Sequence, residues 1–258
     1  MRERNLLDRI LEPGELSVVF QPIFEIRADE RKLHAVECLI RGPRGTNLES
    51  ADLLLEYVRC KREENLVDRV CVETALAVAR ALPGAPRLCL NVHASTVGRG
   101  ESFVQSLAET AQRNEIPLER LTIEIVEHAP PWDEAGFLRA VALLREVGVR
   151  IALDDIGLGQ SNYKMILDTR PDYYKVDRYI VHGCHADFHR RAILESIVQL
   201  ANRFEGQVVA EGVEQAADLH TVLGLGIDLM QGFLLSMAVP FAQMSAVPEL
   251  RAASSPAN

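Results

Sequence analysis

Residues 121–155 read LTIEIVEHAPPWDEAGFLRAVALLREVGVRIALDD, and this stretch decides the fold. An apolar run that ends at Glu124 is followed by a helical pattern over 133–147, which stops at a glycine. A second apolar run then ends in Asp154 and Asp155. Glycine directly after the last helical residue is a common helix end. The order strand, helix, strand predicts a parallel βαβ unit.

The same pattern of an apolar run with a polar end recurs along the chain. A buried strand gains nothing from a terminal charge, because desolvating an unpaired ion costs several kcal/mol. Repeated polar ends therefore predict that the strand tips converge on one functional site, as they do at the C-terminal ends of the strands in (β/α)₈ barrels. Seven runs end in this way, at Glu37, Asn91, Glu124, Asp154 with Asp155, Lys175, Glu211 and Gln231.

The expected fold is α/β, a modified TIM (β/α)₈ barrel with one antiparallel strand near the N-terminus. The short polar turn from Arg27 to Lys32 has hairpin length, which is too short for a parallel crossover. The expected strands are 16–26, 33–40, 87–92, 120–126, 149–154, 173–177, 207–211 and 228–234, and the expected helices are 65–82, 133–147, 188–204 and 213–223.

We expect a single domain over residues 1–258, with a core at about 16–241 and a short polar C-terminal tail. Only 15 residues precede the first expected strand, so no sensor domain is expected before it. The net charge of −9 and the lack of a basic run exclude docking onto duplex DNA or RNA. No apolar stretch approaches the roughly 20 residues of a membrane span. Five cysteines without a Cys-x-x-Cys pair indicate reduced thiols and a cytoplasmic protein.

Alternation of side chains along a strand brings four oxygen donors to the barrel mouth: Glu37, Asn91, Glu124 and Asp154. Asp155 follows directly and must point elsewhere, which suits a ligand that bridges to a second cation. Carboxylates and an amide, without a matching set of Cys or His, select Mg²⁺, Mn²⁺ or Ca²⁺. Two such ions about 3.5–4 Å apart stabilise the attacking and leaving oxygens in phosphodiester hydrolysis.

The next two polar ends, Lys175 and Glu211, supply a cation and a carboxylate that can position and deprotonate water. With these residues the chain resembles the EAL-domain phosphodiesterases, which linearise the bacterial messenger cyclic di-GMP. The resemblance covers roughly residues 16–241. Its segments are FQPI from Phe20, ECLIRG from Glu37, NVH from Asn91, EIVE from Glu124, DDIGLG from Asp154, KVD from Lys175, AEGVE from Ala210 and QGF from Gln231.

The resemblance implies a bacterial signalling enzyme that hydrolyses cyclic di-GMP to linear pGpG. It implies two Mg²⁺ or Mn²⁺ ions per site, inhibition by Ca²⁺, and a homodimer. It also implies a role for each matching residue. The metal ligands would be Glu37, Asn91, Glu124, Asp154 and Asp155; Lys175 would hold the attacking water; Glu211 would be a general base or a ligand of metal-bound water; Glu127 would anchor the Asp-Asp loop; Glu214 and Gln231 would support the site; and Gln21, Leu39 and Arg41 would contact the dinucleotide, Arg41 at a phosphate.

Several positions depart from the family pattern. The signature Glu-Ala-Leu has Cys38 at its centre, and the late Arg-Pro pair is missing. The loop usually written DDFGTGYSS reads DDIGLGQSN over residues 154–162, with Ile156, Leu158 and Gln160 in place of the usual side chains. In the family this loop holds the second cation and links the site to the dimer interface. A catalytically weak cyclic di-GMP receptor is therefore the alternative, while Gln21 and Arg41 argue against a third possibility, a scaffold without ligand.

Histidines offer a second set of candidates. Asn91 and His93 share a strand face by alternation, which allows either a role near the substrate or a capping role for His93. The spacing of His182, Cys184, His185 and His189 is compatible with zinc, but no paired motif accompanies it, and surface histidines are expected.

Overall fold

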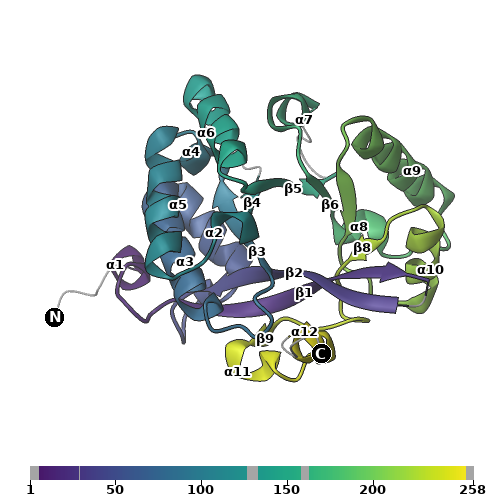
Figure 1. Ribbon diagram of the computed structural model, residues 1–258, viewed down its shortest axis with the longest axis horizontal. Coiled ribbons are helices and arrows are strands. Elements are labelled where there is room, and N and C mark those ends of the chain that lie inside the picture. The colour runs from purple at the N-terminus through teal and green to yellow at the C-terminus, as the bar shows by residue number, and fades with distance from the viewer. Residues whose placement is uncertain (1–5, 29, 127–132, 158–162, 254–258) are drawn as a thin grey trace.

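The computed structural model describes residues 6–28, 30–126, 133–157 and 163–253. Eight strands close into a barrel in the order β2-β3-β4-β5-β6-β7-β8-β1, and the short β9 adds to β1 outside them. In Figure 1 the strands lie at the centre and helices flank them on the outside. The strands are β1 Ser17–Arg27, β2 Glu30–Arg41, β3 Arg87–His93, β4 Leu121–Val126, β5 Arg150–Ile156, β6 Tyr173–Val176, β7 Gln207–Ala210, β8 Leu229–Met230 and β9 Val239–Pro240.

The four expected helices form as α3, α6, α9 and α10, each within a few residues of its expected bounds. The helices in the described residues are α1 Leu6–Ile10, α2 Ala51–Lys61, α3 Glu64–Ala79, α4 Ala94–Val97, α5 Glu101–Arg113, α6 Glu134–Glu146, α7 Tyr163–Thr169, α8 Arg178–Val181, α9 Phe188–Arg203, α10 Ala216–Gly224, α11 Phe241–Met244 and α12 Pro248–Ala253, with 3₁₀ turns at Asn47–Glu49 and Leu118–Arg120. In the part of the chain that the structure describes, no helix is both long enough and apolar enough to cross a membrane.

The reversed strand is β1, as the short turn predicts. It pairs antiparallel with β2 from Ser17 opposite Arg41 to Arg27 opposite Glu30, and it is also antiparallel to β8. The pairings from β2 to β8 are parallel. The expected modified TIM barrel is therefore confirmed.

Side-chain alternation divides the barrel interior into two layers. The lower layer is apolar and buried, and seven strands contribute one residue each. In the upward-running strands, the residue two positions later points into the same interior one step nearer the mouth. The reversed β1 reaches the mouth two positions earlier, at Gln21. The seven residues of the apolar layer are Ile23, Ala35, Cys89, Ala152, Tyr173, Val209 and Leu229.

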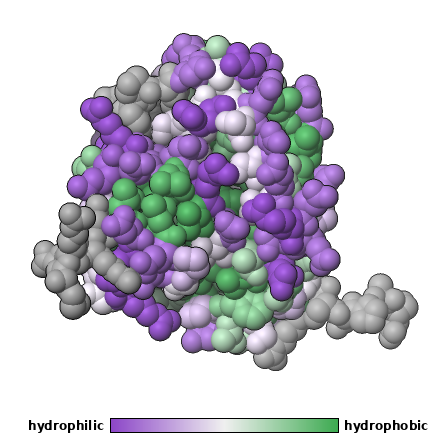
Figure 2. Space-filling model, turned by 90° about the vertical axis from the view of Figure 1, so that its left-hand side faces the viewer, coloured by the Kyte–Doolittle hydropathy of each residue, from purple (hydrophilic) through white to green (hydrophobic). Residues whose placement is uncertain are grey.

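Strand residues that face outward from the barrel pack against the helices. Leu88, Ile123 and Tyr174 are fully buried in this larger core, together with Phe137 of α6. Burying a side chain of this size contributes about 1.5–3 kcal/mol, so the barrel wall and the helices stabilise each other. On the side of the molecule that carries α1 to α6, the surface is a mosaic in which hydrophobic areas are separated by hydrophilic side chains (Figure 2).

A buried carboxylate ties α3 to the end of β3. Asp68 accepts hydrogen bonds from the backbone N–H of His93 at 2.9 Å, from His93 Nδ1 at 2.8 Å and from Thr96 Oγ1 at 2.6 Å. All three residues are buried. Burial lowers the pKa of His93, but the Asp68 carboxylate outweighs burial and the net pKa is raised. Asp68 therefore fixes the strand end that carries Asn91.

We expect Asp68→Ala to lower the free energy of unfolding by about 3 kcal/mol, because it leaves three buried donors without their acceptor. Urea denaturation measures the loss. The matched control is Glu73→Ala on the same helix, whose carboxylate is exposed and lies 3.4 Å from Arg113. The control should change the stability by no more than about 0.5 kcal/mol. Equal effects of the two substitutions would contradict the role of Asp68.

Candidate active site

The upper layer of the barrel interior is a cluster of acidic side chains around one ammonium group. Lys175 Nζ lies 2.9 Å from Glu124 Oε2, 2.9 Å from Glu211 Oε1, 3.0 Å from Asp154 Oδ1 and 3.4 Å from Glu37 Oε1. Lys175 and Glu124 are each 1% exposed. Four strand ends far apart in the sequence therefore meet at one nitrogen, as the polar ends predict.

Two amides complete the cluster. Asn91 Nδ2 donates to Glu37 Oε1 at 2.9 Å. Gln231 Nε2 donates to Glu37 Oε2 at 2.8 Å and to Glu211 Oε1 at 2.9 Å. The other amide atom of Gln231, Oε1, is buried without a hydrogen-bond partner. Because each amide donates its N–H group to a carboxylate, its carbonyl oxygen remains available to another electropositive group.

The buried carboxylates differ in their electrostatics. Burial, together with the charges of Glu37 and Asp154, raises the pKa of Glu124 to about 8 in spite of Lys175. Burial also raises the pKa of Glu211 well above its usual range. For Glu37, Lys175 and the two amides outweigh burial, and its pKa is lowered. The pKa of Lys175 is raised well above its usual range, because the carboxylates outweigh its burial.

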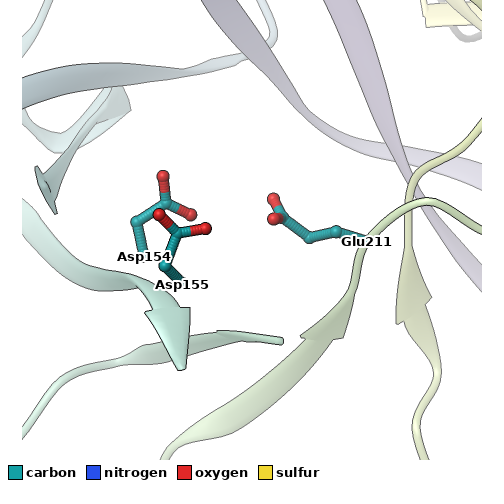
Figure 3. Close-up of side chains that lie close together, drawn as sticks. All are labelled: Asp154, Asp155 and Glu211. Carbon is teal, nitrogen blue, oxygen red and sulfur yellow. The ribbon is translucent and has the colours of Figure 1, made fainter. Parts of the chain in front are cut away.

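Asp155 reaches the cluster through an irregular backbone. Its φ of 52° is left-handed, and the pairing of β5 with β6 is interrupted between Leu153 and Ile156. Regular alternation would turn Asp155 away from Asp154. Instead, one carboxylate oxygen each from Asp154, Asp155 and Glu211 lie within 4.8 Å of one another. Figure 3 shows the two aspartates side by side, facing Glu211.

A close backbone contact holds the ends of β7 and β8 together. Val213 N donates to Gln231 O at 3.0 Å, and Gln231 N donates to Ala210 O at 2.9 Å. A Cβ at Gly232 would lie 2.2 Å from Val213 O, so only glycine fits this approach. This contact places Glu211 and Gln231 next to each other.

The cluster forms one end of a cavity of about 450 Å³. The pairing of β2 with β3 ends at Cys38, which lies opposite Leu90. The pairing of β2 with β1 continues to Arg41. The cavity lies where β2 and β3 separate, and it is lined by Leu39 and by residues of α2 and α3. Gln21 also lines it, and its Nε2 donates to Ser236 O at 3.4 Å. The cavity thus joins a charged mouth to an apolar wall.

The other candidate residues lie apart from the cluster. Arg41 is half-buried and donates to Ile40 O at 3.1 Å, and Glu214 pairs with Arg178 at 3.0 Å. The structure thus brings Glu37, Asn91, Glu124, Asp154, Asp155, Lys175, Glu211 and Gln231 together, and it does not bring Glu214 into contact with them. Glu127, Leu158 and Gln160 lie outside the described residues.

The histidine candidates serve other contacts. His93 binds Asp68 of α3 and not the cluster. His185 Nδ1 lies 2.7 Å from Asp218 Oδ1, and the Cys184 thiol lies 3.6 Å from the same oxygen. Within the described residues, a group of ligand atoms close enough to share a metal ion occurs at Asp154, Asp155 and Glu211, and not among these histidines.

Asp68 was not among the residues expected from the sequence. It lines the same cavity as the cluster and fixes the end of β3. A signal for it was present, because it follows Val67 on the buried face of α3 three residues before Cys71. A charged residue among buried apolar neighbours needs a partner.

The donor set fits divalent metal ions. It consists of oxygen atoms, without cysteine or histidine, which suits Mg²⁺, Mn²⁺ or Ca²⁺. Five clustered carboxylates face a single ammonium group, so additional positive charge would relieve their repulsion. The unpaired, buried Oε1 of Gln231 and the oxygen triad of Asp154, Asp155 and Glu211 can accept it.

Three known proteins illustrate the similarity. Cyclic di-GMP phosphodiesterase TpdA of Vibrio parahaemolyticus is 33% identical over 135 residues, which are 52% of this chain and 23% of TpdA. A standalone versatile EAL protein from Vibrio cholerae, solved in its c-di-GMP-bound form, is 28% identical with a TM-score of 0.78, over 89% of this chain and 94% of that one. The manganese/cy-diGMP complex of Klebsiella pneumoniae BlrP1 is 26% identical with a TM-score of 0.74. The match covers 88% of this chain and 57% of the BlrP1 chain.

This chain spans less than half the length of the curated relatives it matches. The family model described as EAL domain matches residues 3–238, which include all the residues of the cluster. The barrel with its reversed strand, the converging acidic strand ends and this match lead to one conclusion: the chain belongs to the EAL domain family.

Proposed function

We propose that this chain hydrolyses cyclic di-GMP to linear pGpG in a metal-dependent reaction. The observation that carries the proposal is the convergence of four carboxylates on Lys175, with Asp155 completing a second oxygen group beside them. The relatives named as cyclic di-GMP phosphodiesterases and the neighbours solved with cyclic di-GMP support the choice of substrate.

Two groups of residues would hold the cations. Glu37, Asn91, Glu124 and Asp154 form the inner group, and Asp154, Asp155 and Glu211 form the outer group. Bound there, two hard cations would stabilise the attacking and leaving oxygens of the phosphodiester. We propose Mg²⁺ or Mn²⁺ as the activating ions and Ca²⁺ as an inhibitor, since Ca²⁺ accepts looser geometry than Mg²⁺.

Lys175 and Glu211 act on water in this proposal. Their ion pair of 2.9 Å orients the Glu211 carboxylate, which is also held by Gln231. Because burial raises the pKa of Glu211, this carboxylate is a stronger base than an exposed one and suits the removal of a proton from the attacking water. Gln21 and Leu39 line the cavity where the dinucleotide would lie, and Arg41 at the end of β2 would meet a phosphate.

A receptor that binds cyclic di-GMP with little cleavage is the second candidate. The observation that favours it is the left-handed backbone at Asp155, directly before a loop whose side chains depart from the family pattern. Hydrolysis and binding, measured in parallel against Mg²⁺ concentration, separate the two candidates. Turnover that rises with Mg²⁺ supports the enzyme, whereas tight binding without turnover at any Mg²⁺ concentration supports the receptor.

We expect Glu37→Ala to abolish hydrolysis of cyclic di-GMP. Glu37 contributes one carboxylate to the inner group and accepts hydrogen bonds from the side-chain amides of Asn91 and Gln231. Chromatography of the product pGpG measures the rate. A variant that keeps more than about a tenth of the wild-type rate, equal to about 1.4 kcal/mol of barrier, would rule out a ligand role. Glu49→Ala, an exposed acid in the 3₁₀ turn after β2, is the control and should keep the full rate.

Metal binding should release protons, because Glu124 must be ionised to be a ligand and its pKa is raised to about 8. We therefore expect release of about one proton at pH 7 when Mn²⁺ enters the inner group, and an apparent affinity that rises from pH 6 to pH 8 and then levels off. Calorimetry in two buffers with different ionisation enthalpies measures the release. Binding enthalpies that do not depend on the buffer would contradict this expectation.

We also propose a homodimer through the outer face of α6 and α7, here named the α6–α7 face. Leu138, Tyr163 and Leu167 are large hydrophobic residues exposed on these two helices. The helices are joined by an ion pair of 2.8 Å between Lys164 and Glu134. Exposed apolar residues on adjoining helices are typical of contact surfaces.

Leu167→Glu should convert the dimer to a monomer, because it places a charge in the buried contact. Light scattering coupled to size exclusion measures the mass. Leu66→Glu replaces an exposed leucine on α3, away from the α6–α7 face, and should remain dimeric. A wild-type protein that is monomeric at high concentration would refute the dimer.

A further inference from the structure

Lys175 occupies an unusual position for a residue that only orients water. Its ammonium group lies within 3.4 Å of oxygens from all four carboxylates at the strand ends. An ammonium has three N–H donors, so it cannot give each of the four carboxylates its own hydrogen bond. It stands at their common centre, as the ion they share.

The same oxygens are the candidate ligands of the inner group. Glu37, Glu124 and Asp154 contact Lys175 and would also contact a metal ion. Two cations that share buried oxygens repel each other with little screening. The ammonium therefore opposes the entry of a metal ion into the inner group.

Without any cation the inner group would be strained. Glu37, Glu124 and Asp154 all contact Lys175, and Glu37 also accepts hydrogen bonds from two amides. Removing one partner from a buried ion cluster leaves uncompensated charge. Lys175 thus keeps the ligands assembled in the metal-free protein.

We propose that Lys175 is the built-in counter-ion of the inner group, which holds the ligand carboxylates together before metal binds and is displaced when metal enters. The inference rests on the proposed metal site and adds a regulatory property to it, because the affinity for metal is set by competition with the protein's own ammonium.

The test is the neutral variant Lys175→Met, which removes the ammonium and keeps an unbranched side chain one atom shorter. Calorimetry should show Mn²⁺ binding at least about tenfold tighter than in the wild type. The metal-free variant should melt at least about 5 °C lower than the wild type, and saturating Mn²⁺ should restore the difference. The control is Lys32→Met, which removes an exposed ammonium paired with Glu30 and should change neither value.

Mn²⁺ binding that is equal or weaker in Lys175→Met would overturn the proposal. If the variant does not fold without metal, the double variant Lys175→Met with Glu37→Gln decides. It replaces one carboxylate of the inner group with a neutral amide and should be the more stable of the two without metal. A double variant no more stable than the single one also overturns the proposal.

Hydrolysis is measured separately, so the two proposals can fail separately. Tighter Mn²⁺ binding in Lys175→Met, together with a wild type that does not cleave cyclic di-GMP, keeps the counter-ion and rejects the enzyme. A wild type that cleaves cyclic di-GMP, together with unchanged Mn²⁺ binding in the variant, keeps the enzyme and rejects the counter-ion.

Discussion

The two-residue period of the β-strand is the constraint on which the rest of this structure depends. In the upward-running strands, each small or apolar residue of the lower layer is followed two positions later by a residue that points to the mouth. Ala35 precedes Glu37, Cys89 precedes Asn91 and Tyr173 precedes Lys175 in this way. The apolar lower layer therefore closes the bottom of the site, and the acidic side chains cannot extend down into the barrel. Closure of the barrel by β1 brings these strand ends together around one mouth.

The close approach of these carboxylates is tolerated because their charges are offset inside the cluster. One ammonium and two amide N–H groups contact the four carboxylates, and burial shifts the pKa values of Glu124 and Glu211 upward, towards the neutral form. The arrangement is poor for stability, since well-packed apolar residues in the same place would do at least as well. It is suited to binding cations, and the fold supplies the stability from the outer core of strands and helices.

Much of this could be predicted from the sequence, because the apolar runs and their polar ends are local signals. The barrel, its reversed strand and the convergence of Glu37, Glu124 and Asp154 follow from periodicity alone. The helix α5 was missed although Phe103, Val104, Leu107 and Ala111 have helical spacing. The strand β8 is shorter than expected, Leu229–Met230, because the backbone approach at Gly232 ends it.

Other features could not be predicted from local signals. The pairing of Asp68 with His93 joins residues 25 positions apart, and the ion pair of Glu214 with Arg178 depends on where the start of α8 meets the loop after β7. The orientation of Asp155 was the least accessible feature. Strand alternation correctly separates it from Asp154 in a regular strand, and only the left-handed backbone at this position brings the two carboxylates together again.

The left-handed backbone at Asp155 has an evolutionary consequence. Glycine adopts this conformation without strain, and asparagine tolerates it well, yet neither carries a carboxylate. Glycine would relieve the backbone, and either substitution would remove one carboxylate from the oxygen triad. In this chain an aspartate nevertheless stands at the strained position, next to Asp154 and opposite Glu211.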